Sequence, residues 1–286
     1  MAPSPSPEGN SQAVCMQAWN IEFRNLSAGY GSHVVLRDIN AVIPDGKITV
    51  ILGGSGCGKS TLLRHIIGLS RPLAGQVLLG GQDLFALPPG EFRRMRRRMG
   101  VLFQDGALLG ALTLAQNVTL PLSEHLRLPK ALLREAGLRV LRMVGLEDFA
   151  DFYPNQLSGG MRKRAGLARA IIAEPRILLC DEPTSGLDPV TAARMDALLL
   201  SMRRRYADMT IVVVSHDLAS LRVIAEHVLV LGEGRALFSG SPEALEADDD
   251  PYLRQFLHRE AGDDGATLRE AADPAVTAAL DRWLAS

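Results

Sequence analysis

The sequence of 286 residues predicts an α/β protein with a mostly parallel core sheet, an antiparallel β subdomain and an inserted helical subdomain. Two patterns indicate this fold. Short, almost wholly apolar runs alternate with segments of helical periodicity, which is typical of a parallel sheet covered by helices. Near the start of the chain, apolar and polar residues alternate between turn signals, which favours an antiparallel sheet with one solvated face. An apolar content of 47% is enough for a substantial core.

The strands follow in chain order after a tail. Residues 1–18 are rich in Pro and Ser, and we expect them to be disordered. The antiparallel sheet is predicted from the segments IEFRNLSAGY, HVVLRDINAVI and GQVLLGGQDL. Core strands, each expected to be buried on both faces, are predicted at ITVIL (48–52), MGVLFQ (99–104), RILLCD (176–181), TIVVVS (210–215) and HVLVL (227–231).

The helices fall between these strands. The main helical patterns are KSTLLRHIIGL, MRKRAGLARAIIA and VTAARMDALLLSMRRR. ALLREAGLRVLRMVGL belongs to a helical subdomain expected over about 105–165, inserted in a domain that covers 19–245. The extension 246–286 contains a short helix, PYLRQFL, and an amphipathic segment that begins at Asp273. Its apolar stripe, which either packs on its own domain or docks on a partner, is Val276, Leu280, Trp283 and Leu284.

Composition limits the functional classes. The net charge is −1 and the pI is near 6.6, so no global positive field draws the chain to nucleic acid or anionic lipid. The three cysteines lack C-x-x-C spacing, which indicates a reducing compartment. No leader-like start and no apolar run of about eighteen residues is visible, so we expect the chain neither to cross a membrane nor to be secreted.

A glycine-rich segment, GGSGCGKS (53–60), follows an apolar strand and precedes a helix. This context and the pattern G-x-x-x-x-G-K-[ST] predict a phosphate-binding loop, and an ordinary glycine-rich turn is the alternative. In such a loop Lys59 reaches the β- and γ-phosphates and the Ser60 hydroxyl binds Mg²⁺. The predicted loop residues are Gly53, Gly54, Ser55, Gly56, Cys57, Gly58, Lys59, Ser60 and Thr61.

Further polar residues end the buried strands. In ILLCDEPTSGLD, Asp181 is placed to bind Mg²⁺, and Glu182 to orient or deprotonate the attacking water. The alternative is an ordinary solvated pair of acids. His216 ends another strand and is placed to contact the γ-phosphate. Gln104 ends a third, where its amide oxygen joins the Mg²⁺ ligands.

The segment LSGGM (157–161) opens a helix with a serine and two glycines. A helix N-terminus presents free N–H groups and the positive end of a dipole, and glycines let a ligand approach the backbone. We therefore expect an anionic group to bind at Ser158, Gly159 and Gly160.

The order and spacing of these motifs resemble ABC-transporter ATP-binding subunits over about residues 20–245, and LSGGM is highly specific to that family. The resemblance implies the P-loop NTPase fold of ABC ATPases, with ATP and Mg²⁺ as ligands. Tyr30 would stack on adenine, unless it is a surface tyrosine of a turn. Two copies would pair head to tail, so that Ser158, Gly159 and Gly160 of one copy face the γ-phosphate held by the other. Asp188 would cross between the two sites of this homodimer.

A finer resemblance is to the Mla-type phospholipid-transport ATPases of Gram-negative bacteria. It is carried by VLFQDGALLGALTLAQNVTLPLSEH (101–125), GMRKRAGLARAI (160–171) and PYLRQFL (251–257). It implies a membrane permease, a periplasmic MCE-domain lipid-binding protein and a cytosolic STAS-domain subunit. The chain would act at the cytoplasmic face of the inner membrane, in lipid movement between inner and outer membranes. Asp105 and the following Leu108-Leu109-Gly110 depart from the expected pattern and loosen the choice of substrate.

Three questions stay open at this point. GALLGAL (106–112) suits either a groove that receives a permease helix or the buried core. Transport of a small solute is the alternative to lipid. The basic run EFRRMRRRMG (91–100) raises a rival function, an ATPase acting on nucleic acid. The run lacks interleaved aromatic residues, and we expect it to be a solvated helix face with no nucleic-acid partner.

Overall fold

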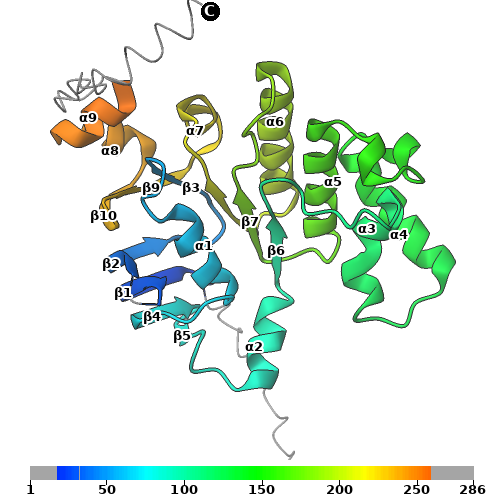
Figure 1. The fold of residues 1–286 in the computed structure, drawn as a ribbon, viewed down its shortest axis with the longest axis horizontal. Coiled ribbons are helices and arrows are strands. Elements are labelled where there is room, and N and C mark those ends of the chain that lie inside the picture. Colours follow the sequence, from blue (N-terminus) through cyan, green and yellow to red (C-terminus); the bar gives the residue numbers. More distant parts are fainter. Residues whose placement is uncertain (1–17, 32, 259–286) are drawn as a thin grey trace, which may run out of the picture. The chain divides into compact units, whose positions relative to one another are not determined.

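The computed structural model describes residues 18–31 and 33–258 (Figure 1). The chain divides into two units, residues 1–245 and 246–286. The first unit contains both sheets, and the second contains the short helix α9 (Pro251–His258). Residues 1–17 of the predicted tail, and the predicted stripe from Val276 to Leu284, lie outside the described residues.

The larger of the two sheets in the described part of the chain has six strands in the order β10-β9-β3-β8-β7-β6. Neighbouring strands from β9 to β6 are parallel, and β10 is antiparallel to β9. The mostly parallel core sheet is therefore confirmed. The strands are β3 (Ile48–Gly53), β6 (Met99–Leu102), β7 (Ile177–Asp181), β8 (Thr210–Val214), β9 (His227–Gly232) and β10 (Arg235–Gly240).

Two features of this sheet differ from the sequence prediction. β6 is not buried on both faces, because Met99 and Val101 on one face line an open groove. β10 was not predicted. Its residues, RALFSG, alternate between exposed and half-buried, and the strand lies at the edge of the sheet, hydrogen-bonded to β9.

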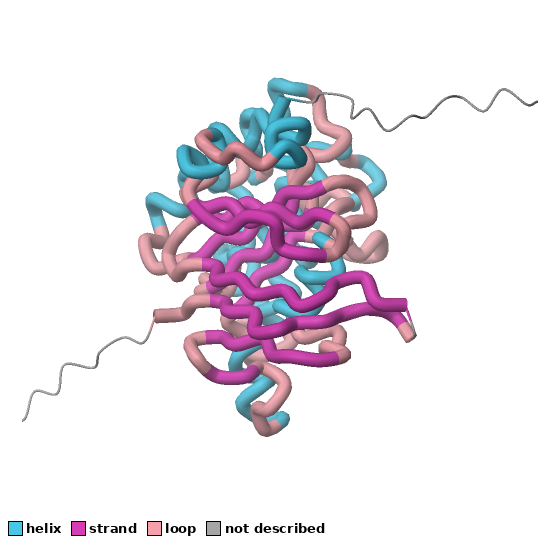
Figure 2. The backbone as a smooth tube through the Cα atoms, turned by 90° about the vertical axis from the view of Figure 1, so that its left-hand side faces the viewer, coloured by secondary structure: helices cyan, strands magenta, loops and turns pink. Residues whose placement is uncertain are grey.

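The second sheet is antiparallel, in the order β2-β1-β4-β5, and confirms the predicted β subdomain. Figure 2 views this side of the molecule, where long strands run side by side. The core that joins the two sheets contains Phe23 of β1, Leu36 of β2 and Leu229 of β9, all almost completely buried. The strands are β1 (Ile21–Tyr30), β2 (His33–Ile43), β4 (Ala74–Leu79) and β5 (Gln82–Asp83).

Several helices are preceded by a residue whose side chain caps them. Ser158 and Asp188 each accept a hydrogen bond from a backbone N–H in the first turn of the helix that they precede. The helices are α1 (Lys59–Ile67), α2 (Pro89–Arg96), α3 (Leu114–Ser123), α4 (Lys130–Met143), α5 (Gly159–Ile171), α6 (Pro189–Arg205), α7 (Leu218–Ile224) and α8 (Pro242–Glu246), with short 3₁₀ helices η1 (Glu147–Phe149) and η2 (Pro154–Gln156). Within the described ranges, no helix combines the length and the apolar character needed to span a bilayer.

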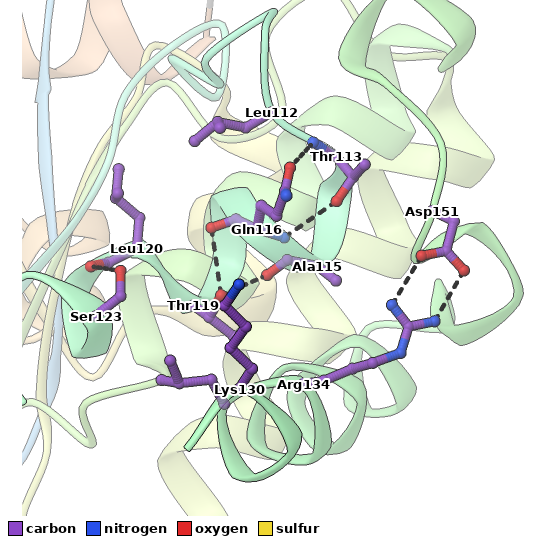
Figure 3. Close-up of a pocket in the computed structure, with 11 residues that line it drawn as sticks. Leu112, Thr113, Ala115, Gln116, Thr119, Leu120, Ser123, Lys130, Arg134 and Asp151 are labelled. Carbon is purple, nitrogen blue, oxygen red and sulfur yellow. Dashed lines mark hydrogen bonds and ion pairs between the residues drawn. The ribbon is translucent and has the colours of Figure 1, made fainter. Parts of the chain in front are cut away.

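Helices α3, α4 and α5 pack together beyond the β6 edge of the core sheet (Figure 1). Thr113 and Gln116 form a reciprocal capping box at the start of α3. Arg134 of α4 donates two hydrogen bonds of 2.8 Å to Asp151, and the pair lines a cavity of about 510 Å³ beside α3 (Figure 3). This cavity contains none of the predicted site residues.

Candidate active site

A cavity of about 600 Å³ lies where β3 and β7 end and α1 begins. In doubly wound sheets, ligands bind outside the carboxyl ends of the parallel strands. The residues that line the cavity come from segments far apart in the sequence, and most were predicted. They are Tyr30, Ser55, Gly56, Gly58, Lys59, Ser60, Thr61, Gln104, Glu182 and His216, together with His33, Val35 and Ser185.

The loop between β3 and α1 has the form of a phosphate cradle. Gly56 and Gly58 have φ angles of 78° and 106°, which side-chain-bearing residues rarely adopt. The Lys59 Nζ donates hydrogen bonds to the carbonyl oxygens of Gly53 at 2.7 Å and Gly54 at 2.9 Å. The lysine thus crosses its own loop. Cys57 belongs to the loop but does not line the cavity.

Ser60 connects the loop to the acidic strand end. Its hydroxyl donates to Asp181 Oδ1 at 3.3 Å, and Gln104 lines the same cavity. Burial raises the pKa of Asp181, an effect that the hydrogen bond from Ser60 opposes. Hydroxyl, carboxylate and amide oxygens are the ligands that Mg²⁺ prefers, so this donor set fits a magnesium ion.

Glu182 has a strained backbone. Its φ is 50°, in the left-handed region that disfavours residues other than glycine, asparagine and aspartate. The Glu182 N–H donates to Val214 O at 2.9 Å, which fixes this residue to the end of β8. The Glu182 side chain is only 14% exposed, and its Oε2 lies 2.8 Å from the Nδ1 of His216. A carboxylate and an imidazole therefore meet at the cavity wall.

The other predicted residues lie elsewhere. Ser158 and Gly159 are exposed at the start of α5 and do not line this cavity. The Ser158 Oγ accepts a hydrogen bond of 3.2 Å from Met161 N–H. Gly160 packs against α6, where an added Cβ would lie 2.7 Å from Thr191 Cγ2. Asp188 caps α6, and hydrogen bonds from Thr191 lower the pKa of its carboxyl group.

Sequence reasoning missed Arg64. Its Nη1 donates to the Tyr30 hydroxyl at 2.7 Å, and its guanidinium lies over the Tyr30 ring, 5.9 Å from the centroid. The pair holds the tyrosine at the cavity rim, although the ring is about half exposed. In the sequence Arg64 stands beside His65 in a helix with several other polar residues, so no pattern marked it. His33 and Val35 gave no signal beyond their place after Tyr30.

A separate groove of about 800 Å³ lies between β6, α3 and α5. Apolar Val101, Phe103 and Leu126 line it, and Arg96 and Arg97 of the predicted basic run lie at its wall. Of the two alternatives left open for GALLGAL, the buried core does not hold, because most of the segment is exposed or half-buried. Leu109 is 49% exposed, and Ala107 lines the groove.

The loop that contains GALLGAL is shaped by one buried side chain that the sequence did not reveal. Asn117 of α3 is completely buried. Its Oδ1 accepts from Leu109 N–H at 2.7 Å, and its Nδ2 donates to the carbonyl oxygens of Leu109, Leu112 and Thr113 at 3.0 to 3.1 Å. The loop after Gln104 therefore has a fixed conformation.

A glycine-rich loop between a strand and a helix, beside an acidic strand end in a mostly parallel sheet, defines a P-loop nucleoside triphosphatase. The family model "ABC transporter" matches residues 36–185. The chain belongs to the ABC transporter family, as an ATP-binding and ATP-hydrolysing subunit.

Relatives and solved structures agree with this assignment. The intermembrane phospholipid transport system ATP-binding protein MlaF of Escherichia coli is 40% identical over 83% of this chain and 88% of its own length. The probable ribonucleotide transport ATP-binding protein mkl of Mycobacterium tuberculosis is 39% identical over 90% of this chain and 70% of its own. These relatives confirm the predicted resemblance to the Mla-type family.

The dimeric ATP-binding cassette MJ0796, in a post-hydrolysis state bound to ADP and Pi, has a TM-score of 0.71 to this chain. Its sequence is 33% identical, and the match covers 77% of this chain and 98% of that one. The likeness confirms the ABC ATPase fold.

Proposed function

We propose that this chain drives phospholipid movement between inner and outer membranes, by coupling ATP-dependent closure of a two-copy dimer to a membrane permease. The observation that carries the substrate class is the 40% identity to MlaF, whose name assigns it to intermembrane phospholipid transport. The chain would work at the cytoplasmic face of the inner membrane, bound to the permease. A periplasmic MCE-domain protein and a cytosolic STAS-domain subunit complete the proposed assembly.

The dimer is proposed from the position of LSGGM. Ser158 and Gly159 are exposed, at a helix N-terminus that is suited to anions, yet they lie outside the cavity of their own chain. The MJ0796 cassette is dimeric. A two-fold pair of this chain would place Ser158, Gly159 and Gly160 of one copy over the γ-phosphate in the partner's cavity, with Asp188 between the two sites.

Within the cavity, the loop amides and Lys59 would bind the β- and γ-phosphates, and Tyr30 would stack on adenine. Ser60, Gln104 and Asp181 would hold Mg²⁺, which neutralises phosphate charge when bound. Glu182 would accept a proton from the attacking water, since its carboxylate is shielded from solvent and its backbone is fixed to β8. His216, beside Glu182, would contact the γ-phosphate and keep the carboxylate oriented.

The groove between β6, α3 and α5 is the proposed docking site for a permease helix. Its wall is mainly apolar with charged residues such as Arg96 and Arg97, which suits the two faces of a short amphipathic helix. It opens beside the loop that follows Gln104, and Asn117 holds that loop in place. Rearrangement at Gln104 on ATP binding would thereby reach the permease.

A second candidate substrate is a ribonucleotide or another small solute, because the mkl relative is named for ribonucleotide transport. The two candidates are separated by purifying the tagged full chain with its membrane partners and identifying co-purified small molecules by mass spectrometry. Phospholipid enriched over the same preparation from cells lacking the permease supports the proposal. Enrichment of nucleotides or other solutes in place of lipid overturns it.

A further inference from the structure

Lys163 is the second residue after the LSGGM segment, in the second turn of α5, and its side chain is buried. The residue is only 6% exposed. Its Nζ donates hydrogen bonds to the backbone carbonyl oxygens of Glu182 at 2.8 Å and Ser185 at 2.6 Å. Burial lowers the pKa of Lys163, and the negative charges of Asp105 and Glu182 oppose that shift. A buried ammonium persists only when its donors are satisfied, so these two contacts are structurally important.

The two carbonyl oxygens bracket the turn that carries Glu182. Within this turn, Ser185 N–H donates to Glu182 O at 3.3 Å, and Glu182 itself has the left-handed φ of 50°. A backbone in that region persists only when the surroundings hold it there. Two contacts fix the turn: the Glu182 N–H donates to Val214 O of β8, and the Lys163 ammonium of α5 donates to Glu182 O.

We propose that Lys163 is a positioning residue that holds the Glu182 carboxylate in place for ATP hydrolysis. It does so from the same helix whose N-terminus would serve the partner's nucleotide. The inference rests on the proposed role of Glu182 as the base. As a consequence, α5 cannot shift relative to the turn 182–185 without disturbing Glu182. In the proposed dimer, α5 of each copy would therefore connect the partner's nucleotide, at its N-terminus, with Glu182 of its own chain.

Other contacts make α5 a rigid connector. Arg169 of α5 donates to the carbonyl oxygens of Ala107 and Gly106, each at 2.8 Å, in the loop after Gln104. An added Cβ at Gly166 would lie 2.9 Å from Gly106 Cα, so helix and loop are in direct backbone contact. Lys163 is the cation of α5 that extends this connection to the catalytic turn.

The test measures ATP hydrolysis by the full chain carrying Lys163→Met or Lys163→Arg, with ATP affinity and melting temperature measured on the same preparations. Lys163→Met is expected to lower kcat by about tenfold to a hundredfold, the scale of a small misplacement of a reacting group, with the Kd for ATP unchanged. Lys163→Arg keeps a cation with several donors and is expected to restore part of the rate.

Arg164→Met is the matched control. Arg164 is the next residue of α5, and its guanidinium also donates to a backbone carbonyl, Val144 O at 2.7 Å, but within the helical subdomain. Its loss is expected to lower stability and leave kcat per folded molecule unchanged. Equal losses of kcat in Lys163→Met and Arg164→Met would overturn the inference. So would a loss of kcat that is proportional, across the variants, to the fall in melting temperature.

A double variant separates this inference from the role of Glu182 itself. If Lys163 acts through Glu182, Lys163→Met added to Glu182→Gln gives no further loss in single-turnover rate. If the rate loss of the double variant equals the product of the losses of the two single variants, Lys163 acts independently of Glu182. If Glu182→Gln alone hydrolyses ATP normally, the role of Glu182 fails. If Glu182→Gln is inactive and Lys163→Met is fully active, the role of Glu182 stands and the positioning role of Lys163 fails.

Discussion

The Nδ1 of His216 lies 2.8 Å from the Oε2 of Glu182, where the ends of β7 and β8 meet at the cavity beside the glycine-rich loop. Two residues 34 positions apart in the sequence are brought together because β7 and β8 are adjacent and parallel. The histidine is well exposed and the glutamate is not. The imidazole therefore covers the carboxylate from the solvent side.

Glu182→Gln is expected to bind ATP normally and to hydrolyse it about 10²-fold more slowly, because the amide keeps the shape of the side chain and loses its basicity. Turnover and ATP affinity of the full chain provide the measurement. Glu174→Gln is the control, since Glu174 is also a glutamate with left-handed backbone, φ 49°, but pairs with Arg139 at the surface. Comparable turnover in both variants would remove Glu182 from the catalytic role.

Lys59→Ala is expected to lower kcat/KM by roughly 10²-fold, about 3 kcal/mol, through loss of a preorganised contact to developing charge on the phosphates. Steady-state hydrolysis measures the effect. Lys47→Ala serves as control, because Lys47 is exposed just before β3 and outside the cavity. A kcat/KM close to that of the unmodified chain would show that Lys59 only braces its own loop.

Asn117→Leu is expected to lower the free energy of unfolding by about 3 kcal/mol, because the loop 109–113 loses its buried hydrogen-bond partner. Urea unfolding followed by circular dichroism tests this. Asn155→Leu, at an exposed position of η2, is expected to change it by less than about 0.5 kcal/mol. Similar midpoints for both variants would contradict the structural role of Asn117.

Asp196→Asn is expected to stabilise the protein more at pH 7.5 than at pH 4. Burial raises the pKa of Asp196, and the charge of Asp217 adds to this, against a hydrogen bond from Ser220. With the folded pKa above its unfolded value, stability falls as the pH rises from about 3.8 through the folded pKa. Asparagine does not ionise, so the Asp196→Asn variant does not lose stability in this way as the pH rises.

Asp151 provides a control of opposite sign for this experiment. Its hydrogen bonds to Arg134 lower its pKa, so its contribution to stability is present above the unfolded pKa and lost as the pH falls. Asp151→Asn should therefore cost most stability above about pH 3.8, and progressively less as the pH falls below that value. Urea midpoints measured from below pH 3.8 up to pH 7.5 check the two signs, and the same sign for both variants would contradict the assignment.

Local sequence patterns predicted most of the strands and helices. Strand β3 and the loop before α1 form one continuous segment, so its residues predict the local structure from which one wall of the cavity is built. Helix α3 was not predicted, because Pro121 interrupts its helical pattern. The capping-box residues Thr113 and Gln116 are nevertheless a sequence signal for its start. β10 was missed since half-exposed edge strands lack a continuous apolar run.

The contacts that complete the site could not be predicted from local patterns. In the sequence, Lys163 is one of several cations in a basic helix. Only the fold shows that its ammonium reaches the Glu182 carbonyl. Asparagine is a residue type that usually lies at the surface, yet Asn117 is completely buried. Lys163 pairs with carbonyl groups 19 and 22 residues further along the chain, whereas Asn117 pairs with the loop that directly precedes its helix. In both cases residue type and spacing do not show which backbone groups the side chain reaches.

The contact of Gly166 with Gly106 leaves no room between α5 and the loop after Gln104 for even one methyl group. A saturation library at position 166, selected for transport, is therefore expected to return glycine alone. Engineering of this transporter toward new cargo would have to vary the surfaces around this junction and leave the junction itself unaltered.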